Sequence, residues 1–164
     1  MPTPVLDLTA FWAALDRVPA AADAEALFDV GGDAAEARAA GALRRANLDR
    51  YLQRSGPDAD TILVAEAPGW RGMTNTGIPF TSMRELQDPD GLFADLPVAL
   101  PPEPTAPWEA SSRVVHAALR GWHGPLPVLW AVFPHHPFAA PDRLTNRTPR
   151  PTRSWSPRHP AGSA

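Results

Sequence analysis

Hydrophobic positions recur at helical spacing in three stretches of the chain. The first stretch is Leu8–Val18, and the second runs from the turn Gly31-Gly32-Asp33, where Asp33 is the expected N-cap, to about Arg54. The third is Pro107–Trp122, which begins with a residue well suited to the first position of a helix. The spacing predicts three helices that each pack one apolar face against a core.

Two short runs are continuously apolar instead. Thr61–Ala65 and Pro127–Phe133 each follow a polar or glycine-rich turn, a pattern typical of strands buried on both faces of a parallel or mixed sheet. Helices that alternate with such strands predict an α/β domain with crossover helices. Because ligands of these sheets bind beyond the carboxyl ends of the strands, we expect the chemistry in the loops after Ala65 and Phe133.

Composition narrows the class of protein. A chain of 164 residues fits one domain, and its 44% of hydrophobic residues argues against full disorder. No apolar run approaches the ~20 residues of a membrane span, and the N-terminal residues do not resemble a secretory signal. We therefore expect a cytoplasmic protein with no membrane partner. The absence of cysteine excludes disulfides, thiol nucleophiles, thiolate zinc sites and cysteine-held iron–sulfur clusters.

Charge is unevenly distributed along the chain. All fifteen basic residues are arginine, and the segment Arg143–Ala164 holds five of them and no acid, although the net charge of the whole chain is −3. Such a segment would attract nucleic-acid phosphates without regard to base sequence. A solvated basic tail explains the same pattern equally well.

The loop after the first strand has the composition of a ligand pocket. It begins with Glu66 at the strand end and continues through several glycines and prolines to Phe80 and Ser82. A carboxylate at a strand end can position or activate water, and an aromatic ring in a rigid turn can stack on a planar ligand. A solvated loop acid and a core aromatic residue are the alternative interpretation.

The loop after the second strand contains His135 and His136, followed by Asn146-Arg147-Thr148. Adjacent histidines seldom bind one metal ion together, and no cysteine or third histidine stands at ligand spacing, so we expect no metal and keep both histidines as possible pocket residues. The guanidinium and hydroxyl groups of the second segment suit a phosphate, although an ordinary polar turn would look the same.

Taken together, the two loops resemble a known family. Glu66-Ala67-Pro68-Gly69, continued by Thr76–Thr81, resembles the first motif of the uracil-DNA glycosylase superfamily, and the stretch from Phe133-Pro134 to Asn146–Pro149 resembles its middle region. The resemblance implies a three-layer α/β/α sandwich with a central, mostly parallel sheet. It assigns residues 1–149 to a single domain of this fold and implies that this domain lacks the last helix and strand of the family, as a truncated copy would. Residues 150–164 would then form a disordered, basic, proline-rich tail.

The resemblance also implies an activity, the hydrolysis of the N-glycosidic bond of uracil in DNA during base excision repair, without a cofactor. Glu66 would hold or activate water as the catalytic residue, and Phe80 would stack on a base flipped out of the DNA. The implied base-binding residues are Ala65, Ala67, Gly69, Phe80 and Ala131, and the implied contacts to the DNA backbone, or braces of the loop, are Asn146, Arg147 and Thr148.

This chain departs from the family at Ala131, in its closing loop, in the missing aspartate of the best-known branch and in the missing cysteines of the iron–sulfur branch. Members often carry asparagine at the position of Ala131. They also have a closing His-Pro-Ser loop, to which His159-Pro160-Ala161 of this chain is similar in residue type alone. An alanine cannot form the hydrogen bonds of an asparagine amide. Two alternatives therefore stay open: a non-catalytic nucleic-acid-binding relic of the same fold, and a module that binds a small molecule or protein through the same loops.

Overall fold

The computed structural model describes residues 5–102 and 108–150, so the predicted tail beyond Arg150 lies outside the described part of the chain. Helices and strands are mixed along it, which confirms the expected combination of α and β structure. The elements are α1 (Thr9–Leu15), β1 (Ala24–Glu25), α2 (Ala35–Ser55), β2 (Ile62–Ala65), α3 (Met73–Thr76), α4 (Met83–Gln87), α5 (Ala110–Leu119), β3 (Val128–Ala131) and β4 (His136–Pro137).

The two predicted strands pair with each other in parallel. Ile62 of β2 lies opposite Val128 of β3, and Ala65 lies opposite Ala131. The ladder continues past both strand ends, because the Val132 N–H donates to the Ala65 carbonyl at 2.9 Å. The chain segments that follow β2 and β3 therefore leave the sheet at the same edge.

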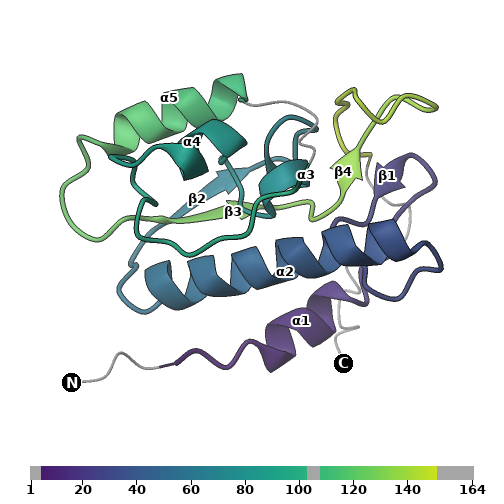
Figure 1. Cartoon of the computed structure of the whole chain (residues 1–164), viewed down its shortest axis with the longest axis horizontal. Coiled ribbons are helices and arrows are strands. Elements are labelled where there is room, and N and C mark those ends of the chain that lie inside the picture. The colour runs from purple at the N-terminus through teal and green to yellow at the C-terminus, as the bar shows by residue number, and fades with distance from the viewer. Residues whose placement is uncertain (1–4, 103–107, 151–164) are drawn as a thin grey trace, which may run out of the picture.

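A second, antiparallel pair lies apart from the first. Ala24 and Glu25 of β1 pair with Pro137 and His136 of β4, and both strands lie at the right-hand end of the molecule in Figure 1. The described strands thus form two separate two-stranded sheets.

Helices lie on both sides of the parallel pair. Figure 1 shows α4 and α5 above β2 and β3, with α1 and α2 below them. The fully buried Tyr51 ties α2 to β3, because its hydroxyl accepts a hydrogen bond from the Leu129 N–H at 2.7 Å. The most deeply buried apolar side chains come from both sides and include Leu27, Leu48, Tyr51, Met73, Ile78 and Leu129.

Two expectations about these elements were wrong. The strands are not buried on both faces: Ile62, Val64 and Val132 are 64%, 56% and 67% exposed. On the same face, Val128 and Trp130 of β3 are half-buried and pack against the core, so this face is exposed chiefly along β2 and just past the end of β3. Asp33 does not cap α2 either, because the N-cap is Ala34 and no side chain bonds there. The acid that orders this turn is Asp29, which accepts a hydrogen bond from the Gly31 N–H at 2.8 Å.

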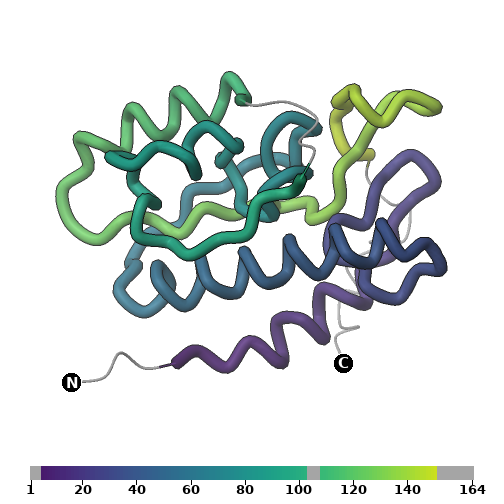
Figure 2. Tube along the Cα trace, in the orientation of Figure 1, coloured from purple at the N-terminus to yellow at the C-terminus, as the bar shows by residue number. Residues whose placement is uncertain are grey.

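The long helix α2 anchors the segment that follows α4. This segment runs back along α2 in Figure 2, and the fully buried Asn47 fixes it. The Asn47 amide donates to the carbonyls of Thr76 and Ala99 at 2.9 and 2.7 Å and accepts from the Ala99 N–H at 2.8 Å. One side chain thus satisfies three backbone groups, one at the end of α3 and two in the segment after α4.

We expect Asn47→Ala to lower the free energy of unfolding by about 2–4 kcal/mol, because it leaves the buried Thr76 carbonyl without this partner and removes two part-buried hydrogen bonds to Ala99. Urea unfolding measures this loss. Arg50→Ala, an exposed position of the same helix, serves as the control and should stay within about 0.5 kcal/mol of the unchanged protein. Equal stability of the two variants would contradict the anchoring role of Asn47.

Candidate functional site

A hollow of about 330 Å³ opens where β2 and β3 end. Every residue predicted from the sequence to be catalytic or base-binding lines it, although the residues come from separate loops. Its lining consists of Val64, Ala65, Glu66, Ala67, Pro68, Gly69, Met73, Pro79, Phe80, Glu109, Ser111 and Ala131.

The parallel ladder fixes the backbone of Glu66. Its carbonyl accepts a hydrogen bond from the Phe133 N–H at 3.0 Å, one position beyond the end of β2. The Glu66 side chain is exposed and lines the hollow. A carboxylate held on a rigid strand end, yet open to solvent, is well placed to orient a water molecule.

The turn that carries Phe80 is held by buried threonines. The Thr76 hydroxyl accepts from the Ile78 N–H and lies 3.1 Å from the Thr81 carbonyl, to which it can donate. Phe80 itself has φ of 51°, in the left-handed region that bulky residues seldom adopt. Such strain persists only where the surrounding structure enforces it, and it is concentrated at functional sites. The turn therefore places the half-buried Phe80 ring at the hollow despite a conformational cost.

Glu109 is a site residue that the sequence analysis missed. It directly precedes α5, and its carboxyl group lies against the turn after β2. A Cβ atom on Gly69 would lie 2.2 Å from Glu109 Oε1, and one on Gly72 would lie 2.1 Å from Oε2. Because neither glycine has a side chain, the Glu109 carboxyl group can occupy this space.

Burial raises the pKa of Glu109 above its usual range, and the negative charge of Glu85 acts in the same direction. A hydrogen bond from Ser111 and the positive charge of Arg71 oppose this shift but do not cancel it. The sequence offered one partial signal, an acid beside a helix start. The predicted start at Pro107 placed this acid inside the helix, whereas α5 begins at Ala110.

A second hollow of about 350 Å³ adjoins the first. The two share Glu109 and the stretch Glu66–Gly69, and the second adds Asn146, Arg147 and Thr148. The Asn146 side-chain oxygen accepts a hydrogen bond from the Trp70 N–H at 3.1 Å, which holds this segment against the turn. The residues predicted to contact the DNA backbone therefore lie beside the predicted base pocket.

Arg147 is already engaged inside the protein. Its Nη2 atom lies 2.6 Å from a carboxylate oxygen of Asp23, and its guanidinium also donates to the carbonyls of Asp23 and Phe138. The hydrogen bond from Arg147 lowers the pKa of Asp23. This arginine braces the last described segment against the residues before β1.

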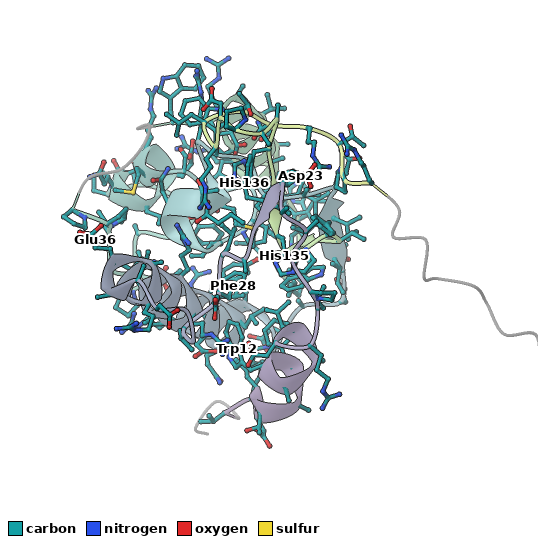
Figure 3. The ribbon with its side chains drawn as sticks, turned by 90° about the vertical axis from the view of Figure 1, so that its right-hand side faces the viewer. Trp12, Asp23, Phe28, Glu36, His135 and His136 are labelled. Carbon is teal, nitrogen blue, oxygen red and sulfur yellow. The ribbon has the colours of Figure 1, made fainter. Side chains whose placement is uncertain are left out.

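His135 and His136 lie away from Glu66 and Phe80. Figure 3 labels both on the face of the molecule that carries β1 and β4, and neither lines the two hollows. Nε2 of His135 donates to the Val18 carbonyl at 3.0 Å, and Nε2 of His136 donates to the Thr145 carbonyl at 2.9 Å. Because β4 pairs with β1, both histidines lie away from the edge at which β2 and β3 end.

The described residues contain no group of three or more histidines and acids placed to hold a metal ion. In the same part of the chain, no helix is long and apolar enough to cross a membrane. Comparisons with protein-family models, with curated proteins and with solved structures found no match.

We expect Glu109→Gln to raise the melting temperature at neutral pH. A carboxyl group whose pKa is raised by folding stabilises the fold fully below its unfolded pKa, and this contribution is lost as pH rises through the folded pKa. Glutamine cannot ionise, so the difference from the unchanged protein should appear at neutral pH and vanish in acid.

Thermal denaturation at the two pH values measures this effect. Glu36→Gln, which alters an exposed acid of α2, should not raise the melting temperature at neutral pH. A melting temperature of Glu109→Gln no higher than that of the unchanged protein at neutral pH would contradict the buried environment of Glu109.

Proposed function

We propose that this chain is a uracil-DNA-glycosylase-like enzyme that hydrolyses the bond between uracil and deoxyribose in DNA. The observation that carries the proposal is the convergence of Glu66, Phe80 and Ala131 on one hollow at the carboxyl edge of two parallel strands. Open α/β sheets bind ligands at this edge. Two motifs that are 50 or more residues apart in the sequence thus contribute to one site, as the resemblance implies.

In the proposed reaction, a base flipped out of the DNA enters the hollow and stacks on Phe80. The bond between N1 of uracil and C1′ of the sugar breaks, and the base leaves as an anion while the sugar gains positive charge. A water oxygen forms the new bond to C1′, and the Glu66 carboxylate accepts the proton of that water. The negative charge of Glu66 also stabilises the developing positive charge on the sugar.

The adjoining hollow would hold the DNA backbone. Asn146 and Thr148 are exposed there and can donate hydrogen bonds to phosphate oxygens. Arg147 serves as the brace of this segment because Asp23 already pairs with its guanidinium. The phosphate contacts in this part of the chain would therefore come from uncharged donors, namely side-chain amide and hydroxyl groups and backbone N–H groups.

The proposal includes the fold of the family, a three-layer α/β/α sandwich. Helices on both sides of the parallel pair β2–β3 support this architecture.

We expect the protein to release uracil from a labelled single-stranded oligonucleotide. Glu66→Ala should lower the rate by about 10²–10⁴-fold, because it removes the group that accepts the proton from water. Glu36→Gln, which changes an exposed acid of α2 outside the two hollows, should leave the rate unchanged.

Two results would reject the glycosylase proposal: no release by folded protein, or equal release by Glu66→Ala. In either case, retention of DNA that weakens with increasing salt would favour the non-catalytic nucleic-acid-binding alternative. A cooperative melting transition must accompany each measurement, so that loss of activity is separated from loss of fold.

Phe80 provides an independent test through binding. Phe80→Ala should weaken the affinity for a uracil-containing oligonucleotide by about 5–150-fold, since stacking of a base on an aromatic ring contributes about 1–3 kcal/mol. Phe80→Tyr keeps the planar ring and should retain most of the affinity. Fluorescence anisotropy measures both, and equal binding by the alanine and tyrosine variants would exclude stacking at this position.

A further inference from the structure

The proposed pocket needs polar groups that recognise the base as well as a ring that stacks on it. Uracil presents a ring N–H donor beside carbonyl acceptors, and a pocket that matches this edge discriminates strongly against bases that do not. Ala131 supplies no side-chain hydrogen bond. Among the described residues that line the hollow, the polar side chains are those of Glu66, Glu109 and Ser111.

The position of Glu109 suits this role. Its carboxyl group lies between Gly69 and Gly72, in space that a Cβ atom on either residue would fill. It lines both the base hollow and the adjoining hollow. The start of α5 thus carries a carboxyl group into the turn that follows β2, which also bears Glu66 and leads to Phe80.

Resting on the proposed function, we propose that Glu109 is a specificity-determining residue: its carboxyl group, in the neutral form, donates a hydrogen bond to a uracil carbonyl and accepts one from the neighbouring ring N–H. A neutral carboxyl group has one O–H donor beside a carbonyl acceptor, which is the complement of this edge of uracil. An ionised carboxylate has acceptors alone, so it repels the uracil carbonyl and the departing anionic base.

The surroundings of Glu109 favour its neutral form. Burial raises its pKa, and Glu85 from α4 raises it further. Arg71 and Ser111 act in the opposite direction, and Glu66, which lines the same hollow, is a further acid on this side of the molecule. With burial as the largest effect, the neutral carboxyl group persists to higher pH than that of an exposed glutamate.

The test compares Glu109→Gln and Glu109→Ala with the unchanged protein for uracil release between about pH 5 and pH 9. Glutamine keeps a donor and an acceptor, so its rate should stay within about threefold of the unchanged protein in acid. The unchanged protein should lose activity as Glu109 ionises at higher pH, and this falling limb should be absent from Glu109→Gln. Glu109→Ala should be about 10–100-fold slower at every pH, because two hydrogen bonds are lost.

The outcomes separate this inference from the function on which it rests. No release by the unchanged protein rejects both. Release with an unaltered falling limb in Glu109→Gln, or with a glutamine variant as slow as the alanine variant, overturns the role of Glu109 and leaves the glycosylase proposal standing. Should Glu109→Ala fail to melt cooperatively, the pH profiles of the unchanged protein and Glu109→Gln decide the question alone.

Discussion

The parallel pairing of β2 with β3 is the constraint on which the site depends. It sets Ala65 opposite Ala131, so that both side chains face the same hollow, and it carries the ladder on to Glu66 and Phe133. Because side chains alternate along a strand, a slip of one residue would turn Ala131 away from Ala65. The geometry of the site is therefore fixed by backbone hydrogen bonds rather than by contacts between the side chains that line it.

The turn after β2 completes the site through two kinds of backbone constraint. Gly69 and Gly72 leave room for the carboxyl group of Glu109, although Glu109 is distant from both glycines in the sequence. Phe80 occupies the left-handed region, at a cost of about 1–3 kcal/mol. The buried hydrogen bonds of Thr76 offset part of this cost, since each contributes about 0.5–1.5 kcal/mol. Packing of the turn thus maintains a strained ring position beside the hollow.

Local sequence patterns predicted which helices and strands form better than they predicted how far each one is buried. Apolar spacing predicted α1, α2 and α5, and continuously apolar runs predicted the strands β2 and β3, because both patterns are properties of neighbouring residues. They did not predict that Val64 is exposed, since cover of a strand depends on segments far away in the chain. The motifs indicated Glu66 and Phe80 but not Glu109, whose role depends on contact with Gly69 and Gly72 across the intervening loop.

If the proposed function holds, the balance of charges around Glu109 would link base recognition to DNA binding. Arg71 is the neighbouring cation, but it is exposed and stacks on Trp70, with 4.6 Å between the guanidinium carbon and the ring centroid. Water screens an exposed charge more effectively than a buried one, so Arg71 offsets burial in part only. A DNA phosphate held by Asn146 and Thr148 would add negative charge in a hollow that Glu109 also lines. It would favour the neutral carboxyl group still further, so bound DNA and the form of Glu109 that matches uracil would support each other.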